Sequence, residues 1–237
     1  MTTEVWHPES VIVVAMEEEA VPFLERADGV SGELHTAANA VRRHLTVGGR
    51  RHELIRAGIG FVNAAAAAAY ALHAFGPETP LISAGTAGGL AAGVRVGEVI
   101  VGSRYVNLNA DATAFGYALG QVPGMPADYA PDAELAAHAL AAGERAEGVT
   151  VRSAAIGSSE TFVTAGRAPQ LRTDFPHVVA VDMETAAFAQ FAHTHHQRFL
   201  SVRAISDLCA PDGTEFLTHV DDAADRSAEV VLALLAA

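Results

Sequence analysis

The chain has 237 residues, half of them apolar, and its 28 acidic and 15 basic side chains give a net charge of −13. This length and apolar content are enough for a single domain over residues 1–237 with a large core. An acidic chain without a lysine or arginine cluster argues against nucleic acid or an anionic membrane as a partner. No apolar run approaches the length of a membrane span.

The cysteine content and the first ten residues indicate the cellular compartment of the protein. Cys209 is the only cysteine, so no internal disulfide can form. The first ten residues lack the basic and apolar segments of a secretory signal. We therefore expect a cytoplasmic protein.

Short apolar runs alternate with helix-favouring runs along most of the chain. Strands are expected at residues 11–15, 41–47, 52–57, 80–84, 94–101, 149–156, 178–181 and 199–205. Helices are expected at residues 63–75, 131–147, 166–173, about 185–195 and 214 to the end, with a turn or helix start at 16–19. This alternation predicts an α/β fold, a three-layer αβα sandwich around a twisted mixed sheet.

Carboxylates follow three of the predicted strands. Glu19 closes a run of three glutamates after the first strand, Asp182 and Glu184 follow another, and Asp207 follows the last. Each could be a helix cap or a solvated first-turn acid. If the strands are parallel, however, their ends meet at one edge of the sheet. A fixed carboxylate there can accept hydrogen bonds from the hydroxyls of a sugar. A pair of carboxylates can catalyse the hydrolysis of a glycosidic bond.

A glycine-rich stretch, GTAGGL at 85–90, follows the predicted strand 80–84. It lacks the lysine of a phosphate-binding loop, and a strand rather than a helix is expected after it, which argues against a dinucleotide site. A structural turn and a cradle for a ligand both remain open.

Residues 107–130 form a long segment without clear periodicity that carries Phe115, Tyr117, Met125 and Tyr129. It is too apolar to be disordered, so we expect it to pack on a pocket or on a partner subunit.

Metal and thiol chemistry are disfavoured by the sequence. His193 and His196 could share a helix face, but they lie at the far end of their helix from Glu184, among polar residues. Cys209 has no evident base beside it, so an inert thiol is expected. We predict no metal site and no cofactor.

Six motifs occur in order: AMEEE at 15–19, GTAGGL at 85–90, DATAFGY at 111–117, GQVPG at 120–124, VDME at 181–184 and RAISD at 203–207. Together they resemble bacterial 5′-methylthioadenosine/S-adenosylhomocysteine nucleosidases, of the purine nucleoside phosphorylase superfamily. The resemblance spans residues 11–207. It departs from the usual pattern in having Asp182 where glutamate is common, Thr86 where serine is common, and an unusual run at 159–162.

The resemblance implies the roles of the acids and of their neighbours. Glu19 would activate water and Asp207 would protonate the purine at N7, with Ser206 supporting Asp207. Arg203 and Thr86 would help to place the water.

The same resemblance implies how a nucleoside substrate is held. Met183 and Glu184 would bind the ribose. The purine would lie against Phe162 and near Ile59. The backbone of Val163 would recognise the edge of the base, and Gly88 would lie close to the nucleoside. The segment 107–130 would reach across a homodimer, where Phe115 and Pro123 would close the neighbour's pocket.

Alternative functions remain open at this point. A nucleoside phosphorylase must bind a phosphate dianion, which the acids at 17–19 disfavour, since the next basic residue is Arg26. Another adenine nucleoside, such as aminodeoxyfutalosine, could be hydrolysed by the same groups. A sensor that only binds nucleosides would need no water-activating base, so the presence of Glu19, Glu184 and Asp207 together favours an enzyme.

Overall fold

The computed structural model describes residues 6–35 and 40–237. The remaining parts of the predicted domain, residues 1–5 and 36–39, lie outside the described residues. The strands are β1 Ser10–Val14, β2 Gly29–Val30, β3 Leu34–His35, β4 Val41–Val47, β5 Arg50–Arg56, β6 Leu81–Gly89, β7 Glu98–Asn107, β8 Thr150–Ser158, β9 Val178–Asp182 and β10 Phe199–Asp207. The helices are α1 Glu17–Arg26, α2 Phe61–Phe75, α3 Ala133–Arg145, α4 Ala168–Asp174, α5 Thr185–His195 and α6 Thr214–Leu235, with a 3₁₀ turn η1 at Thr113–Phe115.

The strands form one mixed sheet in the order β10-β7-β8-β9-β6-β1-β5-β4-β2, with β3 beside β4. Because β10 also pairs with β6, the strands β10, β7, β8, β9 and β6 close into a ring. Parallel pairings join β1 to β5 and β6, β6 to β10, and β8 to β7 and β9. The pairs β10–β7, β6–β9, β4–β5 and β2–β4 are antiparallel. The predicted α/β class with a mixed sheet is confirmed.

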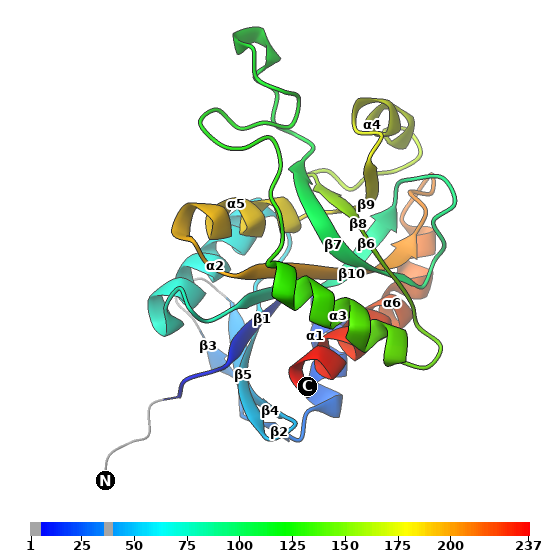
Figure 1. Cartoon of the computed structure of the whole chain (residues 1–237). Coiled ribbons are helices and arrows are strands. Elements are labelled where there is room, and N and C mark those ends of the chain that lie inside the picture. The colour runs from blue at the N-terminus through cyan, green and yellow to red at the C-terminus, as the bar shows by residue number, and fades with distance from the viewer. Residues whose placement is uncertain (1–5, 36–39) are drawn as a thin grey trace.

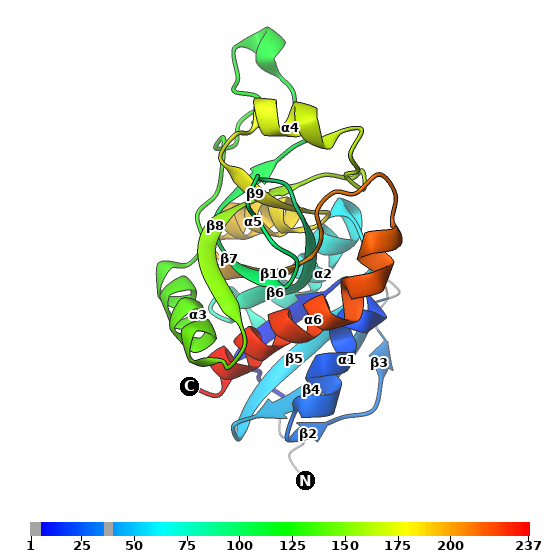
Figure 2. The same ribbon diagram turned by 90° about the vertical axis from the view of Figure 1, so that its right-hand side faces the viewer.

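Helices cover both faces of the sheet (Figures 1 and 2). Helices α2 and α5 pack together on one face, and α6 lies between α1 and α3 on the other. Each face has its own apolar core: alanines of α2 and Phe188 of α5 fill one, and Phe23 of α1 and the C-terminal half of α6 fill the other. The alanine-rich sequence of α2 suits this position, because small side chains let the helix lie close to the strands.

The ends of several strands differ from the prediction. The glycine-rich stretch was expected to leave the sheet after Ala84, but β6 continues to Gly89. It continues because β10 pairs with it as far as Gly88 and β9 pairs with its last two residues. Strands β8 and β10 likewise extend to Ser158 and Asp207. Ladder pairing with β10, and with β9 at the last two residues, therefore overrides the tendency of glycine to break strands.

Segment 107–130 stands out from the rest of the molecule at the top of both views (Figures 1 and 2). It leaves β7 and returns at Tyr129, which exchanges backbone hydrogen bonds with Tyr105. Near its tip, the side chain of Phe115 is 83% exposed. In the ranges 6–35 and 40–237, none of the helices combines the length and the apolar character needed to cross a bilayer.

Candidate active site

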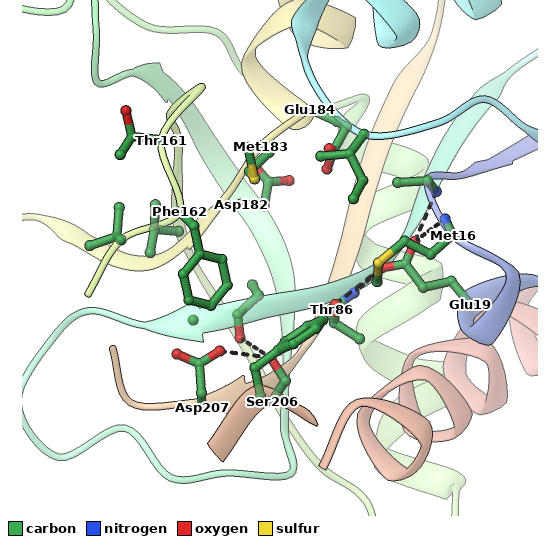
Figure 3. Close-up of a pocket in the computed structure, with 17 residues that line it drawn as sticks. Met16, Glu19, Thr86, Thr161, Phe162, Asp182, Met183, Glu184, Ser206 and Asp207 are labelled. Atoms are coloured by element: carbon green, nitrogen blue, oxygen red, sulfur yellow. Dashed lines mark hydrogen bonds between the residues drawn. The ribbon is translucent and has the colours of Figure 1, made fainter. Parts of the chain in front are cut away.

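One pocket collects the ends of β1, β6, β9 and β10, together with the segments 58–60 and 159–163 (Figure 3). Its lining includes these residues singled out from the sequence: Glu19, Ile59, Thr86, Gly88, Phe162, Val163, Met183, Glu184, Ser206 and Asp207. The expectation that all the strands concerned run parallel holds for β1, β6 and β10 but not for β9, which is antiparallel to β6. The end of β9 still reaches the pocket because β6 and β9 overlap only at their last residues.

Glu19 is buried and held by backbone and side-chain donors from two elements. Its Oε2 accepts hydrogen bonds from the N–H groups of Ala15 at 2.8 Å and Met16 at 3.2 Å. Its Oε1 accepts from the N–H of Thr86 at 2.8 Å and from its hydroxyl at 3.1 Å. Glu19 is thus a first-turn carboxylate of α1 that also faces the pocket, while Glu17 forms an ion pair with Arg56.

Gly85 makes room for this carboxylate. A Cβ atom at this position would lie 2.3 Å from Glu19 Oε1 and 2.8 Å from Arg203 Nη1. At Gly88, a Cβ would lie 3.3 Å from Asp207 Oδ1. The glycines of β6 therefore allow buried charged side chains to approach the backbone of the strand, rather than forming a turn.

Arg203 does not line the pocket but lies buried behind its wall. Its Nη2 is 3.0 Å from Asp182 Oδ2 and 3.6 Å from Glu184 Oε2, and its Nη1 is 3.9 Å from Glu19 Oε1. Its Nη2 also donates to Ser83 Oγ at 2.8 Å. One guanidinium therefore balances three buried carboxylates, and any effect on an attacking water would pass through Glu19.

Asp182 and Glu184 both line the pocket but have different surroundings. Asp182 accepts from Ser158 Oγ at 2.5 Å and from the backbone and hydroxyl of Thr185, so it caps α5 and orients Arg203. Glu184 accepts from the N–H of Gly60 at 2.9 Å and faces the pocket. Burial raises the pKa of Glu184 to about 8, against the opposing effect of Arg203.

Asp207 lies at the other end of the pocket, at the end of β10 (Figure 3). Its Oδ1 accepts from the N–H of Cys209 at 2.9 Å, and its Oδ2 accepts from Ser206 Oγ at 3.0 Å. Burial raises the pKa of this carboxyl group, the two hydrogen bonds oppose the rise, and the charge of Glu215 adds to it. A raised pKa suits a group that must donate a proton near neutral pH.

The remaining wall is apolar. Phe162 packs edge-on against Phe216, with ring centroids 5.8 Å apart, and both line the pocket with Met183 and Val163. Sequence reasoning missed Phe216 and Met16. Met16 follows β1 and could have been found from that position, whereas nothing in the sequence marks Phe216, which α6 brings in from the far side of the pocket.

Phe115 and Pro123 lie in the projecting segment and are not part of this chain's own pocket. His193 packs against Tyr129, with ring centroids 5.6 Å apart, and His196 ends α5 in a left-handed conformation. Cys209 is buried, and burial raises the pKa of its thiol to about 12, as expected for an unreactive cysteine.

Comparisons with known proteins agree with this arrangement. The sequence model of the phosphorylase superfamily matches residues 9–236. A 5′-methylthioadenosine/S-adenosylhomocysteine nucleosidase of Anoxybacillus flavithermus is 36% identical over 222 residues, which are 93% of this chain and 94% of that protein. The crystal structure of the enzyme of that name from Neisseria meningitidis, in complex with methylthio-immucillin-A, has a TM-score of 0.90 at 35% identity. That match covers 95% of this chain and 97% of the other.

The fold is shared more widely. A futalosine hydrolase of Helicobacter pylori has a TM-score of 0.87 over 95% of this chain and 96% of its own, at 23% identity. Such a likeness shows the fold alone, whereas the sequence match above extends over nearly the whole chain. The chain therefore belongs to the phosphorylase superfamily and, within it, to the family of 5′-methylthioadenosine/S-adenosylhomocysteine nucleosidases.

Proposed function

We propose that this protein hydrolyses the N-glycosidic bond of 5′-methylthioadenosine and S-adenosylhomocysteine, releasing adenine and the 5-thioribose product. The observation that carries the proposal is the placement of Glu19 and Asp207 in one pocket, with Glu184 also in its lining. Glu19 at one end of the pocket can activate water, and Asp207 at the other can donate a proton. Glu184 supplies a carboxylate that can bind the sugar. Relatives that carry this name match nearly the whole chain.

In the proposed reaction, Glu19 takes a proton from a water molecule as the water oxygen attacks C1′ of the ribose. The bond from C1′ to N9 of the purine breaks, and its electron pair moves into the base. Asp207 donates its proton to N7, so adenine leaves as a neutral molecule. Glu184 and Met183 hold the ribose, and Thr86 orients Glu19 through its N–H and hydroxyl.

Phosphate is expected not to be a co-substrate. A phosphate dianion needs a free cation or several free N–H donors, but Arg203 is buried and paired with acids, and the N–H groups of Ala15, Met16 and Thr86 donate to Glu19. We expect equal rates of adenine release, and free methylthioribose as product, with and without added phosphate. Formation of a sugar 1-phosphate, at a rate that rises with phosphate, would contradict this.

Two other functions can be separated by the same assay. Faster turnover of aminodeoxyfutalosine than of methylthioadenosine would assign the pocket to that nucleoside, since the fold alone does not select between them. Tight nucleoside binding with no release of adenine would indicate a sensor. We also propose that the protein works in the cytoplasm, where a free thiol such as Cys209 stays reduced.

We further propose a homodimer in which segment 107–130 completes the pocket of the neighbouring subunit. The proposal is supported by the projection of this segment from the fold and by Phe115, a large aromatic side chain that is mostly exposed to solvent.

Replacing Phe115 with alanine is expected to raise KM for methylthioadenosine and S-adenosylhomocysteine more than for adenosine. The reason is that adenosine has no thioether group to pack against the ring. Steady-state kinetics on the three nucleosides would measure this. Equal changes for all three, or a monomer in sedimentation at micromolar concentration, would argue against a shared pocket.

A further inference from the structure

Two segments from distant parts of the sequence form one side of the pocket's rim. Residues 58–61 join β5 to α2 and carry Ile59, while residues 159–163 follow β8 and carry Phe162. Both side chains line the pocket and are also partly open to solvent, Ile59 at 49% and Phe162 at 42%. Within the described residues, no strand pairing joins these two segments.

Glu160 joins these two segments. Its Oε1 accepts a hydrogen bond from the N–H of Phe61, the first residue of α2, at 2.7 Å. Helix α2 begins after Gly60, which has no side chain to cap it, and the first turn of the helix contains no acidic residue. Glu160 therefore supplies, from another segment, the negative charge and the acceptor that the start of α2 lacks.

Gly60 lies between Glu160 and a carboxylate inside the pocket. Its N–H donates to Glu184 Oε1 at 2.9 Å, and a Cβ at this position would lie 3.1 Å from Glu160 Oε2. Gly60 has a φ of 99°, which also requires glycine. Successive N–H groups of one short segment thus bind two carboxylates, Glu184 within the pocket and Glu160 at its rim.

The same rim segment is tied to the projecting loop. The N–H of Glu160 donates to Asn109 Oδ1 at 2.7 Å. Asn109 is held in turn by its own N–H, which donates to Asn107 Oδ1 at 2.8 Å. The backbone of Glu160 is therefore fixed at the base of segment 107–130, so its side chain points to α2 from an anchored position.

We propose that Glu160 is a positioning residue that holds the rim at residues 58–61 so that the N–H of Gly60 keeps Glu184 oriented for the ribose. This rests on the proposed function, because it takes a ribose as the partner of Glu184. A carboxylate has about four acceptor positions, so Glu184 can keep the bond from Gly60 while it accepts hydrogen bonds from ribose hydroxyls. With Glu160 bound to Phe61, Gly60 and Ile59 stay in place beside the substrate.

The test compares Glu160→Ala with Glu160→Gln and with the control Glu144→Ala, which removes an exposed glutamate of α3 outside the pocket. Losing a helix cap supplied from the rim should raise KM for methylthioadenosine about three- to tenfold. We expect kcat to stay within about twofold, since no group on the reacting atoms is lost. Glu160→Gln retains an acceptor oxygen at the same reach and should recover most of the effect.

Amide hydrogen exchange over residues 58–61 gives a readout that needs no turnover. In Glu160→Ala we expect faster exchange there, with and without a bound nucleoside analogue, and no change in Glu144→Ala. An unchanged KM and unchanged exchange in Glu160→Ala would overturn the proposal, as would a fall in kcat alone. An inactive wild-type protein would instead contradict the proposed function, and the exchange measurement would still decide the role of Glu160.

Discussion

Replacing Asp207 with asparagine is expected to lower kcat on methylthioadenosine by roughly 10²–10⁴-fold, the usual contribution of a general acid. Asparagine has the same shape, and it can keep both local contacts. Its oxygen can accept from the N–H of Cys209, and its amide can donate to Ser206, whose hydroxyl also donates to the carbonyl of Ala87 at 3.3 Å. What is lost is the proton that N7 of adenine needs as the glycosidic bond breaks.

Steady-state kinetics and the pH profile of kcat together test this assignment. KM and the melting temperature should change little, because the substitution leaves the pocket intact. In the proposed reaction, Asp207 acts while protonated. Because burial raises its pKa, we expect activity to persist above the usual range of an aspartic acid and to fall as pH rises through the raised pKa. The asparagine variant should lack that fall. A near-normal kcat would require another proton donor.

Glu19→Gln is expected to be about as inactive, with a loss of roughly 10²–10⁴-fold in kcat. A neutral amide cannot take the proton of the attacking water. Glutamine also has one acceptor oxygen where Glu19 uses two, so its NH₂ group would face the N–H donors of Ala15 and Met16 or that of Thr86. The unsatisfied donors should also cost about 1–3 kcal/mol of stability.

The matched control is Glu18→Gln, on the same turn of α1 but exposed to solvent. It should leave kcat and the melting temperature near those of the wild type. Adenine binding, followed by calorimetry, separates chemistry from folding: Glu19→Gln should still bind adenine at the Asp207 end of the pocket. Substantial turnover by Glu19→Gln with an intact fold would show that another group activates the water.

The sequence identified the acids of the site because each follows a run of apolar residues. The position after a strand marks the acids at 17–19, Asp182, Glu184 and Asp207, and the family resemblance singles out Glu19, Glu184 and Asp207, all of which line the pocket. Strand position alone does not separate Asp182 from Glu184. Asp182 also lines the pocket, but it accepts from the first N–H of α5 and forms an ion pair with Arg203, contacts that depend on the fold.

The glycine-rich stretch shows the opposite error. Its composition predicts a loop, either a turn or a cradle for a ligand, yet it is part of strand β6, paired with β10 as far as Gly88 and with β9 at Gly88 and Gly89. Glycine at position 85 leaves space for the side chains of Glu19 and Arg203, which are distant from it in the sequence. Phe216 was missed for a related reason, since its position against Phe162 depends on how α6 returns to the pocket.

The residues of the proposed site fall into two groups, those on the closed ring of strands and those outside it. Strands β6, β9 and β10 carry, at or near their ends, Gly88, Glu184 and Asp207, so the residues proposed to bind the nucleoside and to protonate the base lie on a closed ring of strands. Glu19 lies in the first turn of α1, outside that ring, and is bound to it through Thr86. A redesign aimed at a different attacking molecule would therefore start at residues 15–19 and at Thr86, and could leave Glu184 and Asp207 unchanged.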